Sequence, residues 1–275
     1  MSTITTAAAA AGPAGPPTAA KSWAALGPLT ARSLTSCLRT PSLLLSPLLT
    51  SAFFLIIYEG QLSSVTAATA PGGRYIDVVL PLCLLTTAFT GGATAGQLLV
   101  SDIGSGYHAR LWLTPVGRWA LITAPVLAGV LVLAAQAAAL TGLGLLLGLN
   151  PVSGAPAVLA LIGATILLGT GFLLLAAAVG LHTGNSSAVG SVTLVFFPLS
   201  FFTATFVPRD QLGGWMAHAA DINPLTPPLE AMRSLLTAPW NEQNLLPGTV
   251  VALTLLVAGA AAAHLTLTRR TRTGV

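Results

Sequence analysis

Long runs of apolar residues without any charge alternate with short polar stretches along this chain. A hydrocarbon core about 30 Å thick is spanned by about 20 apolar residues of α-helix, so runs of this length indicate transmembrane helices. The chain has six of them, at 43–58, 78–100, 119–149, 156–181, 188–207 and 248–267. The pattern therefore predicts an all-α polytopic membrane protein with six transmembrane helices.

Residues 1–20 differ from the rest of the chain because they are mostly Ala, Gly, Pro and Thr and carry no charged side chain. They lack the basic region with which a signal peptide begins. This composition is typical of a disordered tail. We therefore expect residues 21–275 to form one membrane domain that follows a disordered tail.

The stretch 28–40 has the periodicity of a short amphipathic helix. Pro28 suits the first helical position, and Pro41 ends the pattern. Arg32 and Arg39 are seven residues apart. Three further residues share one face of the helix: Leu34, Cys37 and Leu38. We expect this helix to lie on the membrane surface, although a cytoplasmic extension of the first span fits the same residues.

Basic residues are unequally distributed between the two sides of the six predicted spans. Eight lie on one side: Lys21, Arg32, Arg39, Arg110, Arg118, Arg269, Arg270 and Arg272. Three lie on the other side: Arg74, Arg209 and Arg233. Loops rich in Lys and Arg stay in the cytoplasm, so we expect both termini to be cytoplasmic.

The outer stretch 208–247 is too long to serve only as a connection between two spans. It holds two amphipathic sets at helical spacing: Leu212, Trp215, Met216 and Ala219, then Leu229, Met232, Leu235 and Leu236. Trp215 and Trp240 suit the interface between membrane and water. These residues predict two short outer helices that dip into the headgroup region or partly re-enter the membrane.

The composition agrees with a membrane protein and excludes a soluble one. Hydrophobic residues make up 54% of the 275 residues and charged residues 7%, whereas globular proteins have about 25% charged residues. The net charge of +4 comes from scattered arginines and a small C-terminal cluster, which argues against nucleic acid binding. Cys37 and Cys83 are far apart in the chain, so we expect two free thiols and neither a disulfide nor a metal site.

The chain lacks the residue patterns of an enzyme. No HExxH, GxSxG or GxxxxGK(S/T) motif occurs. The four histidines are isolated from one another and from carboxylates on the same side: His108, His182, His218 and His264. We expect no catalytic site and no bound cofactor in this chain.

No Asp, Glu, Lys or Arg lies in the middle of a predicted span. An ion-coupled carrier usually has such a residue, because its cost at membrane depth is tolerated only for function. The absence favours a permease driven by a separate protein and leaves a pore as an alternative. Gln97 and Gln136 are the polar exceptions, and we expect each to form an interhelical hydrogen bond.

The inner loop 101–118 combines an acid, a flexible glycine pair, one or two turns of helix and a terminating proline. Such a segment suits a short rigid helix that contacts a cytoplasmic partner. A solvated connection fits the same composition.

Several short motifs occur in an order that is more specific than any one of them. They are Arg32-(x6)-Arg39-x-Pro41; the segment 75–81; Asp102, Gly106, Arg110, Leu111, Pro115 and Arg118; the segments 197–201 and 206–208; and Trp215, Asn223-Pro224-Leu225-Thr226 and Arg233. Together they cover most of the chain and resemble the type 2 ATP-binding-cassette (ABC) exporter permeases, in particular the daunorubicin-resistance-like membrane subunits. This chain departs from the family pattern at Ile103-Gly104, where a charged residue is common, and at Leu82, where glycine is common.

The resemblance implies a half-transporter with six spans, an interface helix, a cytoplasmic coupling helix and two outer re-entrant helices. It would pair with a second permease chain, identical or paralogous, and with two copies of a cytoplasmic ABC ATPase that bind ATP and Mg. The residues expected to contact the ATPase are Arg32, Arg39, Asp102, Gly106, Tyr107, Arg110, Leu111 and Pro115. The residues expected in the outer gate or re-entrant segment are Pro208, Trp215, Asn223, Pro224 and Arg233.

The expected function is export of a hydrophobic or amphiphilic small molecule, similar to a drug or antibiotic, from the cytoplasm or inner leaflet of a bacterial-type cell membrane by alternating access. Five phenylalanines are candidates for an apolar substrate path: Phe53, Phe54, Phe89, Phe197 and Phe201. Aromatic residues in spans also commonly face lipid or neighbouring helices. The alternatives are an exporter of a lipid or lipid-linked glycan, and a membrane scaffold without transport activity.

Overall fold

The computed structural model describes residues 19–69, 74–104, 118–203 and 213–273, and every structural statement below concerns these residues. They form nine α-helices and one short 3-10 helix, without a β-strand. The helices are α1 (Ala19–Leu38), α2 (Pro41–Thr69), α3 (Ile76–Gly104), α5 (Arg118–Leu146), α6 (Gly154–Thr183), η1 (Ser186–Val189), α7 (Gly190–Phe201), α8 (Trp215–Ile222), α9 (Thr226–Thr237) and α10 (Glu242–Thr273). The prediction of an all-α protein is confirmed for this part of the chain.

Five helices are long and apolar enough to cross a membrane, namely α2, α3, α5, α6 and α10. They correspond to five of the six predicted spans. The remaining predicted span, 188–207, falls on η1 and α7, and α7 has 12 residues. At 1.5 Å per residue α7 is about 18 Å long, which is shorter than the hydrocarbon core of a bilayer. Residues 204–212, which include the end of that predicted span, lie outside the described residues.

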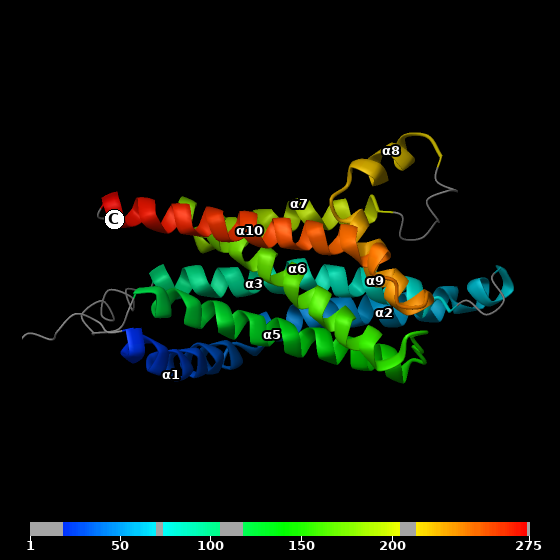
Figure 1. The fold of residues 1–275 in the computed structure, drawn as a ribbon, viewed down its shortest axis with the longest axis horizontal. Helices are drawn as coiled ribbons and strands as arrows, with labels where there is room; N and C mark the ends of the chain where they lie inside the picture. Colours follow the sequence, from blue (N-terminus) through cyan, green and yellow to red (C-terminus); the bar gives the residue numbers. More distant parts are fainter. Residues whose placement is uncertain (1–18, 70–73, 105–117, 204–212, 274–275) are drawn as a thin grey trace, which may run out of the picture.

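The arrangement of the helices places the two described chain ends together. Figure 1 shows the start of α1 and the end of α10 at one end of the bundle, with α8 and α9 at the opposite end. In the same view α7 runs from the end where α6 finishes toward the end where α8 lies. The relative position of the chain ends therefore agrees with termini on one side of a membrane.

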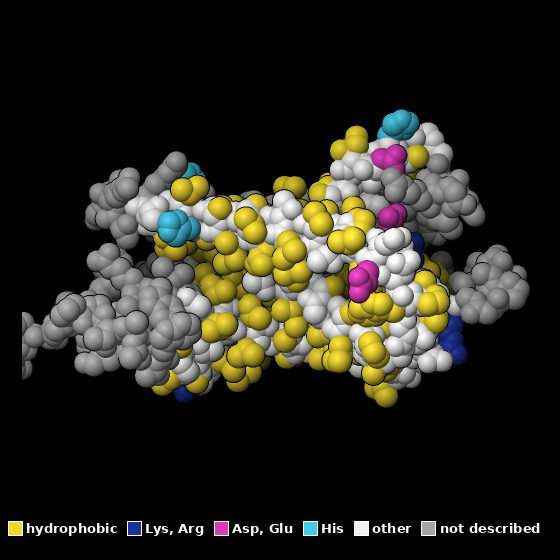
Figure 2. Space-filling view, in the orientation of Figure 1, with side chains coloured by type: hydrophobic (Ala, Val, Ile, Leu, Met, Phe, Trp, Pro, Cys, Tyr) yellow, Lys and Arg dark blue, Asp and Glu magenta, His cyan; other side chains and the backbone are white. Residues whose placement is uncertain are grey.

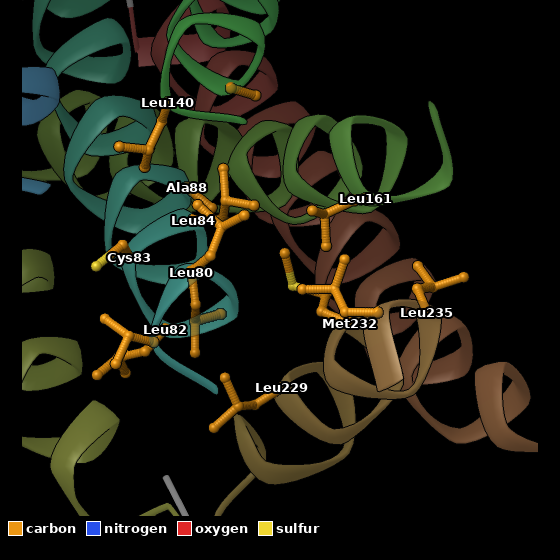
Figure 3. Packing of buried hydrophobic residues seen from close by; sticks show 14 of the residues in the cluster. Leu80, Leu82, Cys83, Leu84, Ala88, Leu140, Leu161, Leu229, Met232 and Leu235 are labelled. Carbon is orange, nitrogen blue, oxygen red and sulfur yellow. The ribbon is translucent and has the colours of Figure 1, made fainter. Parts of the chain in front are cut away.

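Helix α3 is the centre of the bundle. In its membrane window 72% of the residues are buried, against 17% in the windows of α2 and α10, which are at the periphery. The largest core cluster joins Leu80, Leu84 and Ala88 of α3 to residues of α6 and α9. Figure 3 shows these α3 side chains close to Leu161 of α6 and Met232 of α9. The near-continuous apolar sequence of α3 follows from this enclosed position.

Glycines allow α6 to approach two neighbours at backbone distance. A Cβ added at Gly92 of α3 would lie 2.5 Å from the carbonyl oxygen of Gly169 in α6. A Cβ added at Gly259 of α10 would lie 2.8 Å from the carbonyl oxygen of Gly171, also in α6. Close approach through small residues is the usual packing of membrane helices. Glycines serve helix packing at these positions, whereas Gly142 and Gly163 have no neighbour that an added Cβ would meet within 4 Å.

The N-terminal helix differs from the prediction. Pro28 was expected to begin it, but α1 begins at Ala19 and contains Pro28 in its interior. Gly27 and Pro28 are both exposed, so the proline ring does not have to fit against a neighbouring helix. Helix α1 includes residues 19 and 20, and residues 1–18, where the tail is expected, lie outside the described residues. The predicted break before Pro41 is confirmed, because α1 ends at Leu38 and α2 starts at Pro41.

Other predicted boundaries were too narrow. Helix α2 extends to Thr69 instead of residue 58, and α10 begins at Glu242 instead of residue 248. The apolar run marks the part of a helix that lies in hydrocarbon, and a helix does not have to end where that run ends. The two predicted outer helices are present as α8 and α9. The predicted apolar set of α9 is buried: Leu229, Met232, Leu235 and Leu236.

The visible surface has the character of a membrane protein. In Figure 2 hydrophobic and uncharged side chains cover the middle of the bundle, and acidic side chains gather near the end that carries α8 and α9. Exposed leucines and valines of α10 contribute to the apolar surface: Leu246, Val250, Leu253, Val257 and Leu265. A charge-free apolar band between polar ends is what a bilayer requires.

We expect Gly92→Ala to destabilise the bundle, because the new methyl group would overlap the Gly169 carbonyl of α6. Overpacking of this kind typically costs about 1–3 kcal/mol. Thermal unfolding of the purified protein in detergent, followed by intrinsic fluorescence, measures the effect. Gly142→Ala on α5 is the matched control, since its Cβ would meet nothing within 4 Å and should not lower the midpoint. Equal midpoints for the two variants would contradict the proposed close packing.

Candidate functional site

The predicted coupling residues in α1 lie on its exposed side. Arg32 and Arg39 are exposed, whereas Ser33 and Cys37, one turn apart, are buried. Helix α1 packs against α5, and its arginines are turned away from its buried face by roughly a third of a helical turn. The helix is thus amphipathic, and both arginines lie on its exposed side.

The other predicted coupling residues lie near or beyond the end of α3. Asp102 belongs to the last turn of α3, and its side chain is outside the described part of the structure. Gly106, Tyr107, Arg110, Leu111 and Pro115 lie outside the described residues. Figure 1 shows the end of α3 and the start of α5 at the same end of the bundle as the start of α1. The structure therefore brings the two borders of this loop to the end that carries α1.

The predicted outer segment is organised by Asn223. Its side chain is buried between α8 and α9, with 5% of its surface exposed. Its Nδ2 donates a 2.6 Å hydrogen bond to the Leu199 carbonyl of α7, and its Oδ1 accepts a 2.9 Å bond from the Leu225 backbone N–H. Thr226 adds a bond from its hydroxyl to the Ala220 carbonyl. Asn223 thereby joins the ends of three helices.

The remaining residues of the outer set have different surroundings. Trp215 begins α8 and is 69% exposed, with its ring edge-to-face on Phe202. Pro224 is exposed, and Pro208 lies outside the described residues. Arg233 is half-buried in α9, where burial lowers the pKa of its guanidinium and the nearby Glu230 carboxylate opposes that change. An arginine keeps its positive charge under such conditions because its ordinary pKa is far above neutral pH.

The candidate phenylalanines do not form one surface in the described structure. Phe89 is 1% exposed and packs edge-to-face against Phe172, so it belongs to the core. Phe53 is 60% exposed on α2, and Phe54 beside it stacks on Tyr58. Phe197 and Phe201 lie in α7, but their side chains are outside the described part of the structure.

A polar surface that the sequence analysis missed follows one face of α3. Between residues 79 and 101 of α3, six positions are not buried, and five of these carry polar side chains. We call these five residues the polar stripe: Thr86, Thr90, Thr94, Gln97 and Ser101. Their spacing of three or four residues places them on one face of the helix. The signal was present in the sequence, but threonine is so common in membrane helices that its periodicity was not used.

Helices α2 and α7 flank the polar stripe. On the α2 side, Thr87 donates a 2.8 Å hydrogen bond to the hydroxyl of Ser51, which also lies 3.2 Å from the hydroxyl of Thr86. On the other side, Ala93 and Val100 of α3 pack with Val189 and Val192 of η1 and α7. The stripe thus lies between α2 and α7, which cover it only in part: Thr86 contacts Ser51 of α2, and Ser101 is exposed.

The two glutamines of the predicted spans differ in their hydrogen bonds. Gln136 of α5 is buried, and its Nε2 donates a 2.7 Å hydrogen bond to the Leu44 carbonyl of α2, which confirms the predicted interhelical bond. Gln97 makes no hydrogen bond to another of the described residues, so the corresponding prediction is not met within this part of the chain. Gln97 therefore presents an amide on the open face of α3.

No cluster of three or more His, Cys, Asp or Glu side chains that could hold a metal ion occurs among the described residues. Cys37 and Cys83 are both buried, and the two do not form a disulfide. The chemical character of the candidate surfaces is therefore hydroxyl, amide and guanidinium groups, which bind and orient other molecules.

Comparison with known proteins shows that the part of the chain from α1 to α9 is similar to a known protein family. A family model described as ABC-2 type transporter matches residues 25–237, from α1 to the end of α9. The chain is 26% identical over 205 residues to the probable doxorubicin resistance ABC transporter permease protein DrrC of Mycobacterium tuberculosis, with 74% of each chain covered. It is 27% identical over 195 residues to the daunorubicin resistance ABC transporter permease protein DrrB1 of Streptomyces coeruleorubidus, covering 70% of this chain and 67% of that protein.

We expect Asn223→Leu to destabilise the outer segment, because the Leu225 N–H would lose its partner and the Leu199 carbonyl would keep only the Phe202 N–H. An unsatisfied buried polar group costs about 1–3 kcal/mol. Thermal unfolding in detergent measures the loss. Asn241→Leu is the matched control, since Asn241 also accepts a bond from a backbone N–H two residues on but is exposed. A midpoint for Asn223→Leu no lower than that of Asn241→Leu would show that Asn223 does not hold the three helices.

Proposed function

We propose that this chain, which belongs to the ABC-2 type transporter family, is the membrane permease of an ATP-driven exporter for a hydrophobic or amphiphilic small molecule. The chain is a transmembrane subunit without a catalytic site of its own. Two relatives are named for resistance to doxorubicin and daunorubicin, which supports export of an amphiphilic cargo. ABC permeases pair with ATPase subunits, so ATP hydrolysis would take place on a separate protein.

The polar stripe of α3 is the observation that carries the proposal. Polar side chains on the outside of a membrane bundle are unfavourable toward lipid, and they usually face another protein surface or a water-filled cavity. Gln97 has no partner among the described residues, which makes lipid an unsuitable neighbour for this face. In our proposal a second permease chain faces the stripe, and the two stripes border the substrate path.

The chemistry of the stripe suits an amphiphilic cargo. The Thr90 hydroxyl donates its proton to the Thr86 carbonyl at 2.6 Å, and the Thr94 hydroxyl donates to the Thr90 carbonyl at 2.9 Å. Each hydroxyl oxygen keeps its capacity to accept a hydrogen bond. A cargo with an ammonium or hydroxyl group would find acceptors along α3, while its apolar part contacts neighbouring side chains such as Phe53 and Phe54.

The proposed topology has six spans with both termini in the cytoplasm. It counts α7 as the sixth crossing, supported by its course between the two ends of the bundle in Figure 1. The excess of Lys and Arg near the chain ends supports the cytoplasmic assignment of that end. Helices α8 and α9 would then lie at the outer face and form the gate or re-entrant segment with Asn223.

Coupling to the ATPase would use the end of the bundle opposite α8. We assign the contact to Arg32 and Arg39 of α1 and to the segment that contains Asp102, Gly106, Tyr107, Arg110, Leu111 and Pro115. Movement of the ATPase subunits upon ATP binding would tilt α3 and its neighbours and move cargo outward by alternating access. The support is that the start of α1, the end of α3 and the start of α5 lie at one end of the bundle.

Reversal of both charges on α1 should weaken ATPase binding. We expect Arg32→Glu with Arg39→Glu to lower the yield of a copurifying soluble ATPase by about tenfold, which corresponds to ~1.4 kcal/mol. The measurement is gentle purification from the native membrane followed by mass spectrometry for a soluble protein with a Walker A motif. Arg74→Glu, an exposed arginine just before α3 at the opposite end, is the control and should leave the ratio unchanged. A wild-type chain that is always purified alone would reopen the scaffold and pore alternatives.

Loss of polarity in the stripe should reduce export without releasing the ATPase. We expect Thr90→Val combined with Gln97→Leu to lower ATP-dependent uptake of a fluorescent anthracycline into inside-out vesicles. Thr254→Val on α10 is the matched control, because this exposed threonine donates to the carbonyl four residues earlier, as Thr90 does, but lies on another face. Wild-type transport by the double variant would remove the stripe from the path. Transport of a lipid but not of an anthracycline would favour the lipid exporter instead.

A further inference from the structure

A cavity of about 160 Å³ lies between α6, α9 and α10, and no residue of the polar stripe lines it. Its lining includes Gly163 and Leu167 from α6, Met232 and Leu235 from α9, and Leu245 and Ala252 from α10. The one polar side chain in the lining is Thr249, and its hydroxyl already donates to the Leu245 carbonyl at 2.9 Å. Apart from this hydroxyl oxygen, the side chains that line the cavity are apolar.

The packing of the three helices explains why the cavity exists. Helices α6 and α10 touch at Gly171 and Gly259, and α9 lies against α10 where Gly248 approaches Ala231. Between these two contacts the position of Gly163 has no side chain, and a Cβ added there would meet nothing within 4 Å. Figure 3 shows Leu161 of α6 beside Met232 and Leu235 of α9, which belong to the same core cluster.

The cavity opens toward the surroundings of the bundle. Gly163 and Thr249 are exposed, whereas Leu168, Met232 and Leu235 are buried and close the inner side. The neighbouring surface carries large apolar side chains that point outward: Leu159, Leu246 and Val250 are 70%, 58% and 54% exposed. Both α6 and α10 are candidate membrane spans at these residues. The opening therefore faces hydrocarbon.

The depth of the cavity matches one leaflet. Its α10 residues, 245–252, lie three to ten residues after the start of that helix, or about 5–15 Å along it. Its α6 residues, 160–168, lie about 9–21 Å from Gly154. Half of a hydrocarbon core is about 15 Å thick. The cavity is thus at the level of the lipid tails in the leaflet at the α8 and α9 end.

We infer that this cavity binds the acyl chain of a membrane lipid from that leaflet. An apolar protein cavity of about 150 Å³ stays dry and takes up small hydrocarbons such as benzene, because water finds no hydrogen-bond partner in it. Here the medium outside the opening is itself made of hydrocarbon chains, so a lipid tail reaches the cavity without crossing a polar layer. The lipid would fill the space beside α9 and hold the outer segment against α10.

Photolabelling tests the site without any transport assay. The full chain is reconstituted in phosphatidylglycerol vesicles that contain a phosphatidylcholine with a diazirine in the middle of one acyl chain, and labelled residues are mapped by mass spectrometry. We expect labelling at Leu245, Thr249 and Ala252 above that at Leu253 and Val257, which are exposed on α10 and report ordinary contact with lipid.

Filling the cavity should abolish the excess photolabelling at the residues that line it. We expect Gly163→Leu to reduce labelling at Leu245 and Ala252 to the level at Val257, and Thr249→Leu, at the opening, provides a second variant if the first does not fold. Gly142→Leu is the matched control, because that glycine of α5 is equally open but lies outside the cavity. Unchanged labelling in a folded Gly163→Leu or Thr249→Leu protein would overturn the proposal. So would crosslinks between two copies of the chain at these residues, since they would make a second copy the occupant.

Discussion

Contact between helix backbones is the constraint on which this bundle depends. Within a bilayer, apolar side chains gain little by leaving lipid for one another, so helices associate through close van der Waals contact and hydrogen bonds. Helix α6 meets α3 at Gly92 and α10 at Gly259, at distances that leave no room for a Cβ. Helix α3 also contacts α2, α5, α7 and α9 and is the enclosed helix of the bundle, whereas α10 contacts α6 and α9 and stays at its edge.

Helix α3 is apolar on the face that the bundle encloses and polar on the face that is open. Inward positions such as Leu80, Leu84 and Phe89 are buried and apolar, as the medium demands. The threonines on the open face donate to carbonyls of their own helix, which reduces their cost in hydrocarbon, but the Gln97 amide has no such arrangement among the described residues. Polar side chains on the open face of α3 would be unfavourable toward lipid. We therefore expect another molecule to contact this face.

Hydropathy was sufficient to predict most of the fold, since length and charge-free composition are what the bilayer selects. It did not resolve the span at 188–207, where α7 has only 12 residues, because apolar composition does not report where a helix breaks. It also failed at Pro28, which was placed at a helix start although α1 begins at Ala19. A helix boundary predicted from a single proline is less reliable than a span predicted from a long apolar run. Tertiary contacts and exposure decide whether a helix tolerates a proline in its interior.

The candidate site was less accessible to sequence reasoning for a related reason. Asn223 stood out by its motif, but only coordinates show that its amide joins α7, α8 and α9. Phe89 was assigned to a substrate path by residue type, yet its direction toward Phe172 makes it a core residue. Residue type predicts a chemical ability, whereas the face of the helix on which a side chain lies depends on how neighbouring helices pack around it.

Helix α3 also connects the polar stripe to the segment proposed to contact the ATPase. The polar stripe runs from Thr86 to Ser101, about 22 Å along one helix, and ends one residue before Asp102. A force applied to the segment after α3 therefore acts on the same rigid element that carries the stripe. The contacts of Gly92 and Gly96 with α6 lie between the two ends of the stripe. A tilt of α3 about these contacts would move Thr86 and Ser101 in opposite directions, which is the movement that alternating access requires of a path between two chains.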